Sequence, residues 1–360
     1  KLGARTGNNF SKKVQIQGFL AYGLKDQTFK YGGDVIWLFS KNPRKGFQIA
    51  YKYDVEQLGA SLHTINKDNI FSSLFFRGSN DKLTLVREYK ISYEHEWFTG
   101  FSNTFSLNHR EMFPLGLTSF IIHPKGNEVT DSMNNIFTTE ARIDFRLSFR
   151  ERYVSGQFYR YTISSPYPII QLSYSYGFPR LFNSDFEYHR LGLGIKQWFN
   201  FATIGYSKYI IEAGKIWGTL PYSLLKIHEG NQTFFFDEYA SSLMNYYEFV
   251  SDEYITAYYT HHFEGLLFNK IPGFRKLKWR EVAHVRGVYG TLSSRNAGFS
   301  LFPDKMRSFG KEIYWEAGAG VENIFKVFRV DVIWRLSHLN DPQNLNVPKF
   351  GIFASANFSF

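Results

Sequence analysis

The chain has 360 residues, no cysteine and a formal net charge of +10 at pH 7. The absence of cysteine excludes disulfides, thiol catalysis and cysteine-ligated metals. Aromatic residues make up 19%, more than a soluble core needs, yet the mean hydropathy is only −0.30. No window approaches about 18 uninterrupted apolar residues, which excludes a helical membrane protein.

The first ten residues contain no charged region followed by an apolar stretch, so they do not form a signal peptide. From Val14 onward, apolar and polar residues alternate with a period of two, as in strands with one apolar face. Early segments of this kind are Val14–Tyr22, Phe47–Val55 and Phe101–Arg110. Because an exported barrel needs a signal peptide, we expect the chain to be a mature or excised segment.

Charged side chains of both signs fall on the polar face of two strands. One strand carries Glu88, Lys90 and Glu94, and a later one carries Arg142, Asp144 and Arg146. Mixed signs predict a barrel lining with ion pairs between strands, not a stripe of cations that follows phosphates. We therefore expect no nucleic-acid partner. Basic residues near the rims suit anionic lipid headgroups instead.

Alternation continues through the second half of the chain, at Ile170–Phe178, Leu191–Ile195 and Phe328–Leu336. In the segment 253–265 the pattern predicts that His262 faces inward together with Glu264. A strand that offers only these two ligands is insufficient for a metal site, so we expect no metal. Histidine and carboxylate are ordinary residues of a polar barrel lining.

The last segment places four large apolar side chains on one face, Phe350, Ile352, Phe358 and Phe360. An aromatic residue at the end of a strand is typical of the closing strand of an outer-membrane barrel. A soluble domain would usually fray there. We expect these four residues on the outer face of the closing strand.

The fold class predicted from these segments is all-β, a single transmembrane antiparallel β-barrel over residues 1–360. About sixteen strands fit the chain length, with fourteen as the alternative. Four segments alternate poorly, so the pattern does not determine their strand register: 27–40, 152–163, 201–212 and 231–240. Longer polar or irregular stretches predict loops at one end, namely 66–82, 113–135, 214–230 and 292–311.

Enzymatic motifs are absent from the sequence. There is no nucleophile elbow of the Gly-x-Ser-x-Gly type, no phosphate-binding loop and no dinucleotide fingerprint. We therefore expect no catalytic residue and no cofactor. A hydrolase whose site is assembled only by the fold remains open.

The region from Gly214 to Gly290 is the most distinctive part of the chain, with motifs at Gly214–Pro221, Tyr247–Phe249, His261–Gly265 and Leu277–Glu281. These motifs resemble the carboxy-terminal barrel of uncharacterised Bacteroidota outer-membrane proteins with an amino-terminal carboxypeptidase-regulatory-like domain. That family is more remotely similar to surface-antigen barrels of the BamA and TamA type, which have sixteen strands and insert or export proteins.

Assembly barrels of that type carry an Arg-Gly-aromatic motif on a loop that enters the lumen. The nearest match here, at Arg286, lies in a predicted strand, so we do not carry the motif's role over to it. We expect Arg286 to be an inward arginine beside a small residue.

Four functions follow from this resemblance and from the residues. The first is envelope biogenesis in the bacterial outer membrane, with lipids and other outer-membrane or periplasmic proteins as partners. The others are a passive solute channel, a barrel that anchors soluble domains, and a barrel hydrolase. An assembly barrel predicts an occluded lumen and a weak seam between the first and last strands, whereas a channel predicts an open constriction.

Overall fold

The computed structural model describes residues 1–24, 27–58, 82–116, 119–123, 131–340 and 347–356. Fifteen strands of this part form one antiparallel sheet. Their bounds are β1 (Leu2–Arg5), β2 (Val14–Tyr22), β3 (Phe29–Lys41), β4 (Arg44–Glu56), β5 (Lys82–Phe98), β6 (Phe101–Gly116), β9 (Ile136–Ser148), β12 (Ile169–Gly177), β13 (Tyr188–Asn200), β14 (Tyr206–Trp217), β17 (Glu253–His262), β18 (Arg280–Thr291), β19 (Tyr314–Ile324), β20 (Phe328–Arg335) and β21 (Phe350–Ala356).

Smaller elements lie in the connections. Three two-stranded sheets pair β7 (Phe120–Ile122) with β8 (Asp131–Met133), β10 (Arg152–Ser155) with β11 (Arg160–Ser164), and β15 (Lys226–Ile227) with β16 (Val250–Ser251). The helices are α2 (Pro272–Leu277), α3 (Ser294–Ala297) and the 3₁₀ helices η3 (Leu181–Asn183), η4 (Ala202–Ile204), η5 (Tyr222–Leu224) and η6 (Phe268–Lys270). No helix within the described residues has the length and apolarity needed to cross a membrane.

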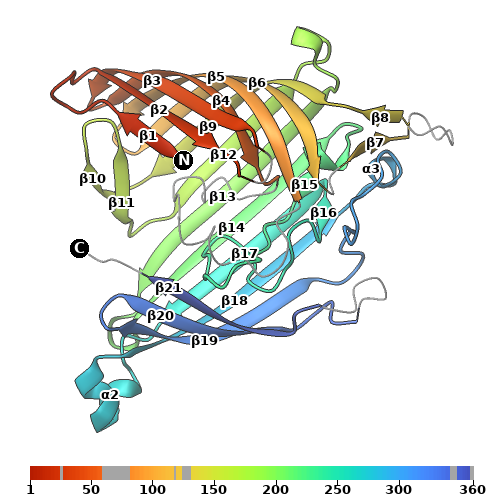
Figure 1. Ribbon diagram of the computed structural model, residues 1–360. Helices are drawn as coiled ribbons and strands as arrows, with labels where there is room; N and C mark the ends of the chain where they lie inside the picture. The colour runs from red at the N-terminus through yellow and green to blue at the C-terminus, as the bar shows by residue number, and fades with distance from the viewer. Residues whose placement is uncertain (25–26, 59–81, 117–118, 124–130, 341–346, 357–360) are drawn as a thin grey trace.

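The sheet curls around a central space, with β1–β4 above, β19–β21 below and β12–β14 between them in Figure 1. β1 and β21 are the two edges of the sheet, and no ladder joins them within the described residues. The all-β, antiparallel class is confirmed. Closure into a cylinder and a total of sixteen strands remain predictions.

Strand register aligns the apolar residues into rows on the outside. Tyr93 pairs with Phe105, Phe105 with Ile143, Ile143 with Tyr174, and Tyr174 with Leu191. Tyr174 is 41% exposed and Leu191 is 40% exposed, so the row is open to the surroundings. The period-two pattern places these residues together because each paired strand contributes the same face.

The two ends of the sheet differ in their connections. At one end, called the turn end, β5 is joined to β6 and β19 to β20 by tight turns. The hairpin β10–β11 and helix α2 lie at this end too. At the other end, called the loop end, the connections 218–252 and 292–313 are long.

An apolar core also lies inside the sheet, which the alternation of the strands did not predict. Leu220, Tyr222, Phe120 and Ile136 belong to one buried cluster near the loop end. Phe249 and Phe309 form a second cluster, and their rings stack at 4.2 Å. The connections at the loop end therefore fill the interior instead of leaving it to water.

Some segments differ from the expectations, and others are segments whose register stayed open in the sequence. β1 was not predicted, because four residues are too few to show a period. The segment 27–40 forms β3, 152–163 forms β10–β11 outside the main sheet, and 201–212 forms η4 and the start of β14. β6 continues to Gly116 and β14 to Trp217, so two predicted loops begin later than expected. The loop 66–82 falls almost wholly outside the described residues.

A tight turn at Gly205 provides a direct test of the fold. Its φ is +98°, and a Cβ there would lie 1.9 Å from the carbonyl oxygen of His262. We expect Gly205→Ala to reduce the free energy of unfolding in detergent micelles by about 1–3 kcal/mol, since both the left-handed backbone and the neighbouring strand oppose a side chain. Urea unfolding followed by tryptophan fluorescence measures this loss.

The matched control is Gly273→Ala. A Cβ at Gly273 would meet nothing within 4 Å, and the residue lies within α2. We expect no loss there. Equal stability of the two variants would contradict the geometry of the turn.

Candidate functional site

The connection between β14 and β17, residues 218–252, enters the interior of the sheet and is called the lumen segment. Its buried residues include Leu220, Leu243, Met244, Tyr247 and Phe249, each at most 1% exposed. In Figure 1 it lies with β15 and β16 between the upper and lower walls. The segment therefore enters from the loop end and occupies the centre of the barrel-shaped sheet.

The lumen segment contacts both sides of the wall. Arg190 of β13 donates to the carbonyl oxygen of Leu224 at 2.8 Å, and Lys208 of β14 pairs with Glu238 at 2.6 Å. Across the interior, the Tyr247 hydroxyl accepts from the backbone N–H of Leu58 at 3.2 Å. These contacts fix the segment to strands that are far apart around the sheet.

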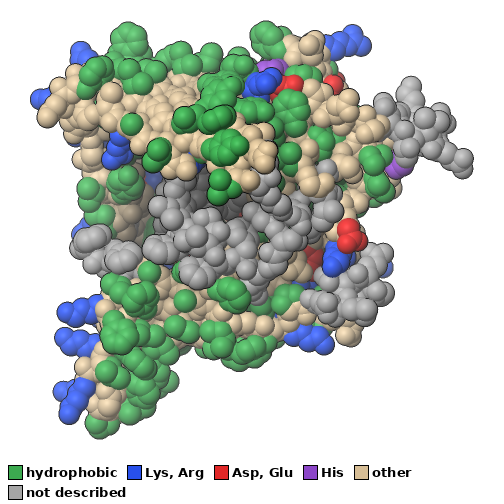
Figure 2. Space-filling view, in the orientation of Figure 1, with side chains coloured by type: hydrophobic (Ala, Val, Ile, Leu, Met, Phe, Trp, Pro, Cys, Tyr) green, Lys and Arg blue, Asp and Glu red, His purple; other side chains and the backbone are tan. Residues whose placement is uncertain are grey.

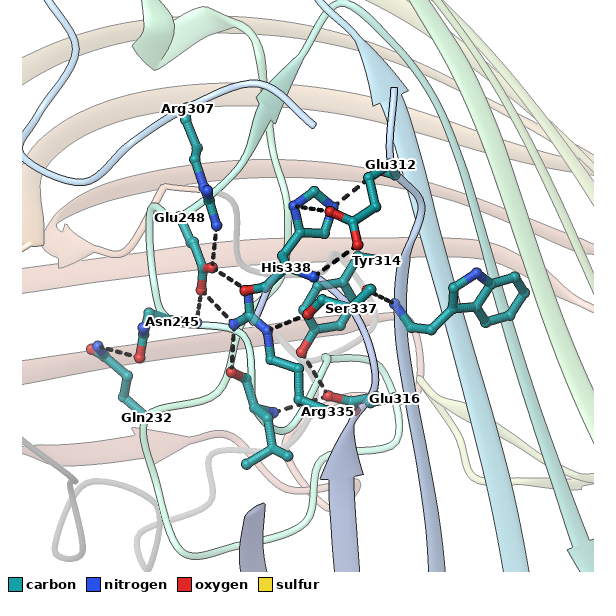
Figure 3. Close-up of polar contacts among 12 residues, drawn as sticks. Gln232, Asn245, Glu248, Arg307, Glu312, Tyr314, Glu316, Arg335, Ser337 and His338 are labelled. Carbon is teal, nitrogen blue, oxygen red and sulfur yellow. Dashed lines mark hydrogen bonds and ion pairs between the residues drawn. The ribbon is translucent and has the colours of Figure 1, made fainter. Parts of the chain in front are cut away.

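A buried ion pair joins Glu248 of the lumen segment to Arg335 of the wall. Arg335, on β20, donates from Nη2 to Glu248 Oε1 at 2.7 Å and from Nη1 to Oε2 at 3.2 Å. Its other N–H groups donate to the carbonyl oxygens of Leu243, Ser337 and His338. Every donor of the guanidinium is thus satisfied, as Figure 3 shows.

A second carboxylate of the wall holds the backbone of the lumen segment. Glu316, on β19 and fully buried, accepts the N–H groups of Ser242 at 2.7 Å and Leu243 at 3.0 Å. The Tyr314 hydroxyl donates to the same carboxylate at 2.9 Å. Both side chains appear beside the ion pair in Figure 3. Charged acceptors strengthen such hydrogen bonds and orient the segment.

Phe236 anchors the segment to the lower wall between two cations. The Arg286 guanidinium carbon lies 4.6 Å from the centre of its ring and that of Arg329 lies 4.5 Å away. Arg286 also donates to the carbonyl oxygen of Asp237 at 2.7 Å, and Arg329 is held by Asp331 through two bonds of 2.7 Å. Cation–π contacts of this kind gain strength where water is excluded.

Next to Phe236, the lumen segment covers the free edge of β21. The Phe236 N–H donates to the carbonyl oxygen of Ala354 at 2.9 Å, and the Ala354 N–H donates to the carbonyl oxygen of Phe234 at 2.9 Å. Phe235 and Ala354 form a parallel bridge. Three residues of the segment therefore take the place of a neighbouring strand at this point.

The turn end of the interior is covered by the hairpin β10–β11, which crosses to the opposite wall. Arg160 pairs with Glu96 of β5 at 2.7 Å, and Tyr159 donates to Gln15 of β2 at 2.6 Å. Beneath the hairpin lies a cavity of about 340 Å³ whose lining includes Glu94 and Arg146. Cations and carboxylates line it together, so its charges largely neutralise one another.

One histidine of the lumen segment is set apart by its surroundings. His228 is 2% exposed and its ring lies 4.8 Å from that of Phe309. Burial, followed by the nearby Lys226 ammonium, holds the pKa of His228 well below its ordinary value. The side chain is therefore neutral at pH 7 and serves packing and hydrogen bonding.

The predicted lining residues occupy separate places. Glu88 pairs with Lys52 at 3.2 Å, Glu94 with Arg44 at 2.9 Å, and Arg142 with Asp144 at 2.6 Å, while Arg146 pairs with Glu151 at 2.6 Å. Lys90 lies in register with Ala50 and Asn108. The ion pairs are thus distributed along the wall and do not converge on one centre.

The remaining predicted residues lie near β17 and β18 or on the last strand, β21. His262 contacts Glu322 at 2.9 Å. Glu264 lies in the turn that follows β17 and pairs with Arg280, which is in register with Glu322. Arg286 is buried in the lining. Phe350 and Ile352 are 51% and 56% exposed on β21. Phe358 and Phe360 lie outside the described residues.

Sequence reasoning missed how the residues of the site pair with one another. Arg335 and Glu248 are 87 positions apart, and Phe235 meets Ala354 across a still longer separation. The signal available was the alternation of β20, which places Arg335 on the inner face. Among the described residues, no group of three or more histidines and carboxylates could hold a metal ion.

Comparisons with known proteins place the chain in a family. No curated protein matches it significantly. Among solved structures it is similar to BamA from Haemophilus ducreyi lacking POTRA domains 1-3, with a TM-score of 0.48, 10% identity and coverage of 98% of this chain and 69% of that one. It is also similar to Pseudomonas aeruginosa OccK11 (OpdR), with a TM-score of 0.30, 8% identity and coverage of 96% and 91%.

Both likenesses are too remote to bear on function. The family described as "Family of unknown function (DUF5686) C-terminal domain" matches residues 1–295, which is most of the chain. The chain therefore belongs to the DUF5686 C-terminal domain family.

Proposed function

We propose that the chain is an integral β-barrel of the bacterial outer membrane. The outward rows of apolar side chains support this proposal, because a soluble protein rarely leaves so much continuous apolar surface exposed. Figure 2 shows apolar side chains over the upper and lower walls. Ion pairs such as Lys52 with Glu88 lie on the opposite face of the same strands.

Its orientation follows from the connections. Outer-membrane barrels have short periplasmic turns and longer extracellular loops. The turn end, where β5–β6 and β19–β20 are joined, therefore faces the periplasm in this proposal. The loop end, where the lumen segment enters, faces outward.

We further propose that the barrel acts in envelope biogenesis, by inserting or translocating protein or lipid. The observation that carries this role is the edge of β21, which the chain's own residues 234–236 cover. Among the described residues, 234–236 bond to this edge, and an incoming strand can replace them because the hydrogen bonds are made by backbone groups common to all sequences. The partners in this proposal are outer-membrane lipids and other outer-membrane or periplasmic proteins.

The occupied interior favours this role over a passive channel. A diffusion pore needs an open constriction, whereas the lumen segment packs against β13, β14, β19 and β20. The proposal assigns no catalytic residue and no cofactor. It includes a Bacteroidota source and an amino-terminal carboxypeptidase-regulatory-like domain, as the resemblance implies. Anchoring of such a domain is compatible with the same barrel.

A disulfide lock tests the proposed role of the edge. The chain has no cysteine, so Phe235→Cys with Ala354→Cys introduces a single pair at bridged positions. We expect the oxidised full-length protein to fail to complement its depletion, measured as the abundance of other outer-membrane proteins. A reductant should restore complementation, because the edge can then be released.

The matched control joins two strands that stay paired. Val332→Cys with Ile352→Cys places a disulfide across the β20–β21 ladder. This variant should complement in both redox states. Full complementation by the oxidised 235–354 variant would overturn the proposed role, while the barrel itself would still stand.

A further inference from the structure

The connection between β17 and β18 forms a projection at the turn end, unlike the tight turns beside it. Residues 265–279, called the foot, contain η6 and α2. In Figure 1 the foot extends beyond the ends of β17 and β18. Such an extension at the end with short turns calls for a separate explanation.

The foot is held in a defined shape. The Glu281 carboxylate on β18 accepts the N–H of Leu267 at 2.9 Å and that of Phe268. The side chain of Asn323, near the end of β19, donates to the carbonyl oxygen of Lys278 at 2.6 Å. Inside the foot, the Phe274 ring stacks on Phe268 at 4.5 Å. Its exposed side chains are therefore presented in fixed positions.

Apolar side chains on the foot are open to the surroundings. Leu267 is 58% exposed, Ile271 45% and Leu277 55%. Phe325, at the neighbouring turn that Asn323 connects to the foot, is 83% exposed. Exposed leucine, isoleucine and phenylalanine beside a lipid-facing wall are typical of segments that enter the membrane interface.

The charge of the foot has one sign. It carries Lys270, Arg275, Lys276 and Lys278, all exposed, and no acidic residue between positions 265 and 279. No ion pair links these four side chains to another described residue. By contrast, Arg280, just beyond the foot, pairs with Glu264. Figure 2 shows Lys and Arg side chains gathered with apolar ones at this corner of the molecule.

We infer that the foot binds anionic phospholipid headgroups of the leaflet at the turn end, with Leu267, Ile271 and Leu277 in the interface and the cations on the phosphates. This inference rests on the proposed membrane location. Cations near an anionic surface each raise partitioning by about fivefold, and four such residues act together. The apolar side chains favour a lipid surface over an acidic protein, because they would otherwise remain exposed to water.

Native mass spectrometry of the full chain released from nanodiscs tests the inference. The nanodiscs contain equal amounts of phosphatidylglycerol and phosphatidylethanolamine. We expect the wild-type protein to retain phosphatidylglycerol several-fold over phosphatidylethanolamine. The variant K270Q/R275Q/K276Q/K278Q should lose this preference, and L267Q/L277Q should weaken it.

The control removes the same charge at the loop end, where Arg295, Lys305, Lys311 and Lys349 are also exposed. The variant R295Q/K305Q/K311Q/K349Q should keep the preference. Equal loss in both quadruple variants, or no preference in the wild type, would overturn the inference. So would a preference that survives removal of the four foot cations.

Barrel folding is checked separately by heat-modifiable migration in gels. A folded foot variant without lipid preference supports the foot inference, and a folded wild type without preference rejects it while leaving the membrane location standing. Failure of the wild-type chain to enter nanodiscs at all would instead reject the membrane location on which the inference rests.

Discussion

Replacement of residues 220–249 by a short Gly-Ser linker is expected to give the protein a stable, continuously open conductance that the wild-type chain lacks. The lumen segment enters the interior from the loop end and is fixed to both walls through Arg190, Lys208, Glu316 and Arg335. Its removal leaves a polar lining that water and ions can fill. Single-channel recording in planar bilayers measures the change.

The hairpin β10–β11 covers part of the turn end, so a second variant without residues 152–164 and without the lumen segment should conduct more than either single variant. Replacement of foot residues 266–277 is the control, because the foot lies outside the interior, and it should leave conductance at the wild-type level. Stable large openings in the wild-type chain would contradict an occluded lumen and favour a passive channel.

Substitution of Arg335 by methionine is expected to cost about 3–5 kcal/mol of the free energy of unfolding, as removal of one partner of a buried ion pair does. Arg335 is 3% exposed and Glu248 1%, and the remaining carboxylate would be left buried without its main partner. Urea unfolding in detergent micelles gives the value. The double variant R335M/E248L should recover part of the loss, because no unpaired charge remains.

Arg142→Met provides the comparison for this loss. Arg142 also pairs with a carboxylate on the inner face, Asp144, but the two side chains are 24% and 35% exposed. Water screens such a pair, so the variant should lose less than about 1 kcal/mol. If both arginine variants lost the same amount, burial would not be what makes the Glu248 pair strong.

The sequence was sufficient to predict the strands and their outward faces, and insufficient to predict the conformation of the lumen segment. Alternation in β4, β9 and β20 fixed which side chains face outward, since the period of a strand is independent of its partners. The lumen segment has no period, because its shape is determined by contacts such as Glu316 with Ser242 that come from distant strands. Tertiary contacts of this kind leave no local pattern.

The same reasoning explains the errors at the edges. β1 is too short for a pattern, and the alternation of β17 ends at His262, two residues before Glu264. The foot was not predicted. Its fixed shape depends on Glu281 and Asn323 of neighbouring elements.

The lumen segment both fills the interior and covers the last described strand, β21. Its Phe236 ring packs between two guanidinium groups, while the Phe236 backbone is hydrogen-bonded to Ala354. The residues that fill the interior and the residues that cover the edge of β21 consequently belong to one segment. Separation of residues 234–236 from β21 must displace the lumen segment, and displacement of the lumen segment must expose the edge of β21. The filling of the interior and the covering of the β21 edge therefore depend on the same residues.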